Sequence, residues 1–125
     1  MILSKLRLFP SPKKRPQVLA ALLSVQEPTQ VKPGCLASQV YEEVGQNGAI
    51  LYLEEWESEQ EFRQHVRSEL YRRILAAVDM SHSAPETCFY MVSSVHGLEL
   101  IQQIRSSPHE TETAVQKAQS EGFHA

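Results

Sequence analysis

Two side chains that could do chemistry, Trp56 and His65, stand where a strand pattern gives way to a helix pattern. Large side chains alternate up to Trp56, and Ser58 followed by Glu61 forms a capping box that starts a helix. On an ideal helix His65 lies about 60° from the apolar Phe62, so we expect its imidazole at the edge of the buried stripe, facing both cavity and solvent. His65 is therefore a candidate proton acceptor with an aromatic neighbour.

The strand before this junction has large side chains on both of its faces. Ile50, Tyr52 and Trp56 lie on one face, and Leu51 and Leu53 lie on the other. A strand that is apolar on both sides has to be covered on both sides. The chain's own helices can provide one cover, and a second sheet, a second subunit or a ligand has to provide the other.

Apolar periodicity predicts the remaining elements. Alternation indicates four strands, at residues 3–9, 36–43, 49–56 and 87–95. Helical spacing indicates a helix of about three turns that ends at Pro28, a long helix that begins after Ser58 and breaks at Ser68, and a short helix over 98–104. The glycine-rich turn at 45–48 joins the second and third strands as a hairpin.

This order of elements is that of an α+β ferredoxin-like βαββαβ fold, in which both helices cover one face of a four-stranded antiparallel sheet. We assign the domain to residues 1–105 and a polar C-terminal tail to residues 106–125. The bare face of the sheet is apolar, so we predict a homodimer through that sheet face that closes a shared barrel.

Composition limits the possible partners. The chain has 125 residues, 42% hydrophobic residues and a net charge of −3, which indicates one soluble domain without a basic field. RNA-recognition domains share the βαββαβ order, but here the third strand ends in glutamates that repel phosphate. We therefore predict no nucleic acid and no membrane partner.

The location and the metal content follow from two further patterns. Lys5 and Arg7 interrupt the apolar N-terminus before a signal-peptide core forms, and a cytoplasmic location is predicted. Cys35 and Cys88 lack metal-ligand spacing, so we predict no metal site and no disulfide, and we expect both to be buried free thiols.

Acidic residues cluster around the same junction. Every charged residue from 42 to 61 is a glutamate, and Glu54 and Glu55 lie at the end of the third strand. The simplest interpretation of this cluster is that it consists of solvated strand ends and helix starts.

Four short segments follow one another along the chain: Pro33-Gly34-Cys35-Leu36, Glu54-Glu55-Trp56-Glu57-Ser58, His65-Val66-Arg67-Ser68 and Leu75-Ala76-Ala77. In this order and spacing they resemble the antibiotic biosynthesis monooxygenase domain family. The resemblance covers about residues 4–105. It implies a dimeric α+β barrel built from two ferredoxin-like protomers.

The resemblance also implies an activity. Enzymes of this family oxidise quinols, anthrones and related polyphenols with molecular oxygen and without a metal or flavin, so the chain resembles a cofactor-independent monooxygenase of a small aromatic ligand. A deprotonated substrate is its own electron donor, and the protein then supplies a base, an apolar pocket and donors for the developing oxyanion. In this interpretation His65 is the base, and Trp56 and Tyr71 hold the ring and its oxygens. The substrate-binding residues are Tyr52, Phe62 and Phe89 around the ring and Arg67 or Arg72 as oxyanion partner.

Two other interpretations stay open at this point. Trp56 is also explained as a core or dimer-interface residue, and His65 as a capping or surface histidine. The chain would then be a non-catalytic module for small-ligand binding or dimerisation, which agrees with the lack of a dense catalytic constellation.

Haem-degrading oxygenases form another branch of the same superfamily. They place an asparagine in the first strand, a tryptophan on the second helix and a histidine further along it as iron ligand. This chain has no asparagine in its first strand, and His65 and Leu75 stand where the tryptophan and the ligand histidine would be. We therefore predict that no cofactor is bound.

Overall fold

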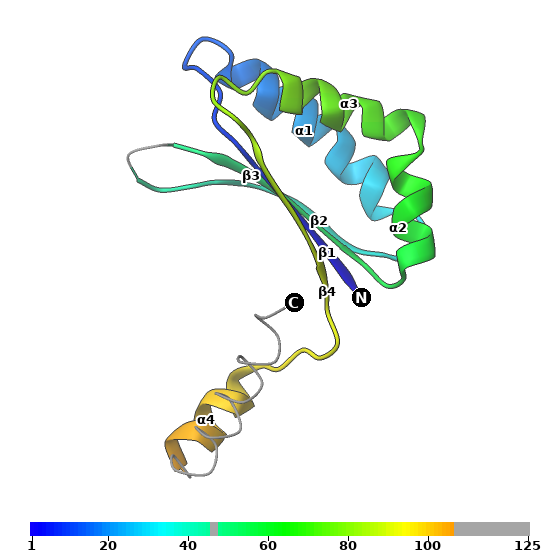
Figure 1. The fold of residues 1–125 in the computed structure, drawn as a ribbon, viewed down its shortest axis with the longest axis vertical. Coiled ribbons are helices and arrows are strands. Elements are labelled where there is room, and N and C mark those ends of the chain that lie inside the picture. The colour runs from blue at the N-terminus through cyan, green and yellow to red at the C-terminus, as the bar shows by residue number, and fades with distance from the viewer. Residues whose placement is uncertain (46–47, 107–125) are drawn as a thin grey trace. The chain divides into compact units, whose positions relative to one another are not determined.

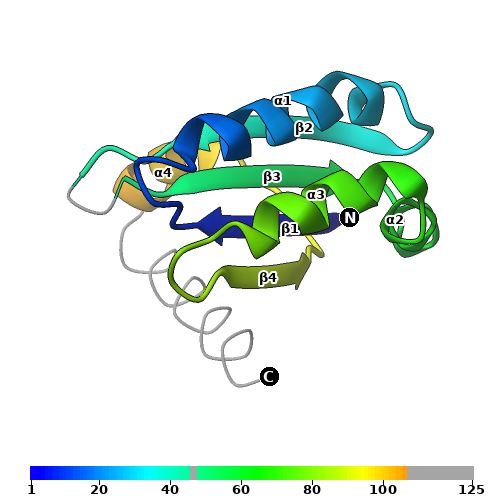
Figure 2. The ribbon, with the colours of Figure 1, turned by 90° about the horizontal axis from the view of Figure 1, so that it is seen from above.

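The computed structural model describes residues 1–45 and 48–106, which form a four-stranded antiparallel sheet and four helices. The strands pair in the order β2-β3-β1-β4, and the helices α1, α2 and α3 lie on one face of the sheet (Figures 1 and 2). The ferredoxin-like prediction is confirmed. In chain order the elements are β1 (Ile2–Leu8), α1 (Arg15–Gln30), β2 (Cys35–Glu42), β3 (Ile50–Trp56), α2 (Glu59–Val66), α3 (Glu69–Asp79), β4 (Glu86–Met91) and α4 (Leu98–Ser106).

The chain divides into two compact units. The first comprises Met1–Ser93 and holds the sheet with α1, α2 and α3. The second begins at Ser94, and its described part contains α4, a short helix with Leu98 and Ile101 in its apolar stripe. Nearly all of the predicted polar tail lies outside the described residues.

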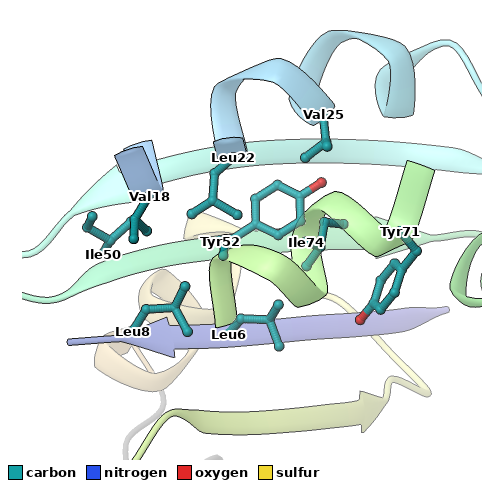
Figure 3. Packing of buried hydrophobic residues seen from close by; sticks show 10 residues of the cluster. Leu6, Leu8, Val18, Leu22, Val25, Ile50, Tyr52, Tyr71 and Ile74 are labelled. Atoms are coloured by element: carbon teal, nitrogen blue, oxygen red, sulfur yellow. The ribbon is translucent and has the colours of Figure 1, made fainter. Parts of the chain in front are cut away.

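The core lies between the sheet and the helices because β1 and β3 each alternate between buried and half-buried positions. Residues of one parity face the helices, as the alternation of a strand requires. They pack against one side of α1 and one side of α3, as Figure 3 shows. The buried cluster consists of Leu6, Leu8, Val18, Leu22, Val25, Ile50, Tyr52, Tyr71, Ile74 and Ala77.

The predicted break in the second helical segment is confirmed. Ser58 caps α2 by accepting from the backbone N–H of Glu61, and Ser68 caps α3 by accepting from the backbone N–H of Tyr71. Two separate caps allow the chain to change direction between the helices. As a result α2 contributes the buried His65, and α3, which runs in another direction, contributes the buried Tyr71.

Two predicted boundaries are wrong. The first helix passes Pro28 and ends at Gln30, because Thr29 is buried and the Gln30 side-chain amide donates to the carbonyl oxygen of Ser38 at 2.9 Å. The fourth strand ends at Met91 and its residues are all exposed. It is an edge strand that pairs only with β1, so Cys88 is an exposed free thiol and not a buried one.

The sheet face opposite the helices carries the odd-numbered residues of β1 and β3. Leu3, Leu51 and Leu53 are half-buried there, and Tyr41 and Tyr90 are exposed. Among the described residues, no helix is long and apolar enough to cross a membrane.

Candidate functional site

A buried carboxylate organises the polar part of the core. Glu54 on β3 is 1% exposed and accepts three hydrogen bonds: from the Tyr52 hydroxyl at 2.6 Å, from Trp56 Nε1 at 3.0 Å and from His65 Nε2 at 2.8 Å. Tyr52, Glu54 and Trp56 alternate along β3, so all three point toward the helices. The expectation that this carboxylate is solvated at a strand end is therefore wrong for Glu54.

His65 has a partner at each ring nitrogen. Its Nε2 lies against Glu54, and Lys32 Nζ lies 2.9 Å from its Nδ1. An imidazole protonated at Nε2 donates to the carboxylate and accepts from the lysine, so this tautomer satisfies both contacts. His65 is 2% exposed, which corrects the expectation that its ring faces solvent.

Lys32 connects this network to the surface. It lies after α1, is half-buried, and also donates to Ser68 Oγ at 3.1 Å. Burial lowers the pKa of Lys32, and the charge of Glu54 opposes that shift. The three side chains Lys32, His65 and Glu54, called here the relay, form a continuous hydrogen-bonded chain from the half-exposed amine to the buried carboxylate.

Aromatic rings enclose the imidazole. The Trp56 ring lies 4.7 Å from the His65 ring, and the Tyr71 ring meets it edge-on at 5.2 Å. Tyr71 reaches from α3 toward β1, as Figure 3 shows, and its hydroxyl has no hydrogen-bond partner among the described residues. Burial, and secondarily the charge of Glu54, raises the pKa of Tyr71 to about 12, so this hydroxyl is a protonated donor at neutral pH.

An apolar pocket lies between α2 and β4. It has a volume of about 360 Å³, and Phe62, Val66, Phe89 and Met91 form its apolar lining. The rings of Phe62 and Phe89 are 5.5 Å apart. The volume falls in the range of small-molecule pockets, and the apolar lining suits an aromatic ring.

A second pocket lies on the other side of α2. It has a volume of about 270 Å³, and Lys32, Trp56 and His65 contribute to its wall. Glu61 also lines it, and one oxygen of that carboxylate is buried without a hydrogen-bond partner among the described residues.

The structure brings most of the predicted site residues together in two groups. Trp56 and Tyr71 each contact His65, and Tyr52 joins this group through Glu54. The other predicted residues stand apart from that group. Phe62, Arg67 and Phe89 line the apolar pocket, whereas Arg72 pairs with Glu69 at 3.5 Å and its side chain is 77% exposed.

Glu54 and Lys32 are the functional candidates that the sequence reasoning missed. A signal for Glu54 was present, because it alternates with two aromatic residues on the buried face of β3. No local pattern distinguishes Lys32, whose contact with His65 arises from tertiary packing. Within residues 1–45 and 48–106, no group of three His, Cys, Asp or Glu side chains is arranged to hold a metal ion.

Solved structures similar to this chain have the same fold. A candidate antibiotic biosynthesis monooxygenase from Deinococcus radiodurans is 19% identical, with a TM-score of 0.70, and the match covers 78% of this chain and 97% of that one. A conserved protein from Methanosarcina mazei is 26% identical, with a TM-score of 0.65 and coverage of 71% and 89%. A candidate monooxygenase of the same kind from Nitrosomonas europaea is 13% identical, with a TM-score of 0.66 and coverage of 75% and 100%.

Among curated protein sequences, none matches this chain. The sequence profile of the antibiotic biosynthesis monooxygenase family matches residues 1–77, which include β1 through most of α3 and therefore the whole relay. The chain belongs to the antibiotic biosynthesis monooxygenase family.

Proposed function

We propose that the protein is a cofactor-independent monooxygenase that oxidises a small aromatic hydroxy compound, of the quinol or anthrone type, with molecular oxygen. The observation that carries the proposal is the relay, in which His65 is held between Glu54 and Lys32 and enclosed by aromatic rings. Membership of the family and the apolar pocket beside α2 support it. A buried histidine paired with a carboxylate is a common arrangement for a general base.

In this proposal the substrate ring packs against Phe62 and Phe89 in the apolar pocket, and His65 takes the proton of its hydroxyl group once the side chains that separate His65 from this pocket have moved. Lys32 then passes a proton toward the second pocket and solvent. His65 is almost fully buried, so substrate binding has to displace part of its cover, and Tyr71 is the neighbour whose hydroxyl has no partner among the residues that the structure describes and can donate to the substrate oxygen.

The oxidation needs no further reductant. At an anthrone methylene the balance is CH2 + O2 → C=O + H2O: one oxygen atom becomes the new carbonyl, and the other leaves as water with both hydrogens. The carbanion or phenolate formed by His65 supplies the four electrons that reduce O2. The protein's contribution is to remove the proton, hold the ring and exclude bulk water.

Oxygen uptake by metal-free and flavin-free protein tests this proposal. We expect uptake on addition of an anthrone or a hydroquinone, above the rate of spontaneous oxidation, and a loss of at least about 100-fold in His65→Gln, since general bases contribute about 10²–10⁴-fold. His82→Gln serves as the control, because His82 is exposed. Circular dichroism establishes that each variant is folded, and unchanged uptake in folded His65→Gln would remove the proposed base.

A second candidate function is a non-catalytic module that binds a small aromatic ligand. The specific observation in its favour is that both nitrogens of His65 are already engaged by protein groups. This candidate predicts that the same aromatic compounds raise the melting temperature without any oxygen uptake. Measured turnover would exclude it.

We also propose that two copies pair through the sheet face that the helices leave open. The half-buried Leu3, Leu51 and Leu53 form an apolar surface there, and such a surface usually marks an interface. We expect the protein to sediment as a dimer and Leu53→Glu to sediment as a folded monomer. A wild-type protein that sediments as a monomer at all concentrations tested would contradict this part of the proposal.

A further inference from the structure

The apolar pocket between α2 and β4 has a charged rim on its α2 side. Phe62 and Phe89 form the aromatic part of the lining, and Glu59, Arg63 and Arg67 form the rim. The same three charged residues also line an adjoining polar pocket of about 520 Å³. A ligand whose ring occupies the apolar pocket can therefore extend a polar substituent along this rim.

The two arginines of the rim differ in their partners. Arg63 is held by Glu59 through two hydrogen bonds, from Nε at 3.0 Å and from Nη2 at 2.8 Å. Arg67 makes no side-chain hydrogen bond or ion pair with any described residue. The rim holds one carboxylate and two guanidinium groups, so one positive charge remains, and it belongs to Arg67.

We infer that this pocket selects an anionic aromatic substrate, a hydroxylated ring that carries a carboxylate, and that Arg67 binds the anion. The inference rests on the proposed function, since it takes the apolar pocket as the place where the substrate ring binds. A guanidinium group forms two parallel hydrogen bonds with a carboxylate. Arg67 is exposed, so a hydroxylated ring that lacks the acid leaves it hydrated and gains no ion pair. Arg67 is thus a specificity-determining residue, distinct from the base His65.

Binding of a matched pair of quinols tests the inference. Gentisate is a hydroquinone with a carboxylate, and its methyl ester has the same ring without the charge. Dissociation constants are measured by calorimetry in oxygen-free buffer, which prevents turnover. We expect gentisate to bind up to about fivefold more tightly than the ester, since one partly exposed ion pair contributes at most about 1 kcal/mol, and we expect this preference to decrease as salt is added.

The variant Arg67→Gln should reduce the ratio of the two dissociation constants to about one and leave the affinity for the ester within about twofold. Arg72→Gln is the matched control, because Arg72 is exposed and does not line the pocket. It should keep the wild-type ratio. Equal binding of the two probes by the wild-type protein, or a preference that persists in Arg67→Gln, would overturn the inference.

Oxygen uptake measured separately distinguishes this inference from the proposed function. Selective binding of gentisate without oxygen uptake would support the anion site and contradict the monooxygenase. Oxygen uptake with equal affinity for acid and ester would support the monooxygenase and contradict the anion site.

Discussion

The substitution Glu54→Gln tests whether a carboxylate organises the core, with nearly the same shape and one charge fewer. Three donors converge on the two oxygens of Glu54: Tyr52 and His65 on one oxygen, and Trp56 on the other. An amide has a single oxygen. If the amide oxygen accepts the hydrogen bonds of Tyr52 and His65, the amide nitrogen faces the indole N–H of Trp56. Both of these groups are donors, so no hydrogen bond forms between them.

The magnitude follows from these contacts. A buried donor without a partner costs about 1–3 kcal/mol, and each of the two remaining hydrogen bonds loses about 1 kcal/mol when its acceptor becomes neutral. The neutral amide avoids the cost of burying a charged carboxylate, and this gain offsets part of the loss. We expect Glu54→Gln to lower the free energy of unfolding by about 2–4 kcal/mol at pH 7.

Urea unfolding at one fixed protein concentration measures this difference. Trp56 is the chain's single tryptophan and contacts Glu54, so its fluorescence reports on the site itself, and circular dichroism reports on the fold. The matched control is Glu57→Gln, because Glu57 is exposed and its substitution should change stability by no more than about 0.5 kcal/mol. A value for Glu54→Gln equal to that of the control would refute the assignment of Glu54 as the organising acceptor.

Two further substitutions probe the same region. The pKa of Tyr71 is raised to about 12 by burial, so between about pH 10 and about 12 the unfolded chain has lost a proton that the folded chain keeps, and stability falls by up to about 1.4 kcal/mol per pH unit. Tyr71→Phe should make this alkaline loss of stability less steep and change stability little at pH 7. The control Tyr41→Phe, on the exposed part of β2, should keep the wild-type dependence of stability on pH. The same dependence in the wild-type protein and both variants would contradict the reasoning. Ser68→Ala should destabilise the fold by about 1–2 kcal/mol more than Ser58→Ala. Each serine caps a helix, but Ser68 makes two additional hydrogen bonds, with Lys32 and with the carbonyl oxygen of His65. Equal losses of stability in thermal unfolding would mean that these two bonds contribute nothing.

The sequence predicts the fold well because its patterns agree with one another. Alternation along β1 and β3 defines the buried face, and the capping residue Ser68 marks the break between α2 and α3. The ends of α1 and β4 were misplaced for a physical reason. Pro28 predicts a helix end, but the Gln30 side chain hydrogen-bonds to β2 and the helix continues to that residue. The alternation up to Val95 predicts strand, but β4 pairs with β1 only as far as Met91.

The site was predicted only in part. The contact of His65 with Trp56 and Tyr71 follows from the strand and helix periods. Of the two arginines predicted as alternative oxyanion partners, Arg67 lines the apolar pocket and Arg72 lies in solvent. Arg72 follows the buried Tyr71 directly, and a step of about 100° on a helix turns it to the solvent side. Glu54 was missed because glutamates were interpreted as solvated, and Lys32 because its position depends on how the turn after α1 packs against α2.

The relay is poorly explained by stability alone. A buried carboxylate seldom contributes net stability, and apolar side chains would fill the space beside Trp56 and Tyr71 without the cost of removing a carboxylate from water. If the relay only fixed the position of α2, Lys32→Met would weaken folding and leave the chemistry of the remaining folded protein unchanged. If the relay carries protons, folded Lys32→Met keeps its affinity for the quinol and loses oxygen uptake, because His65 then has no group that passes its proton to solvent. Uptake per folded molecule equal to that of the wild-type protein would therefore exclude Lys32 from the proton path and leave its contact with His65 a structural role.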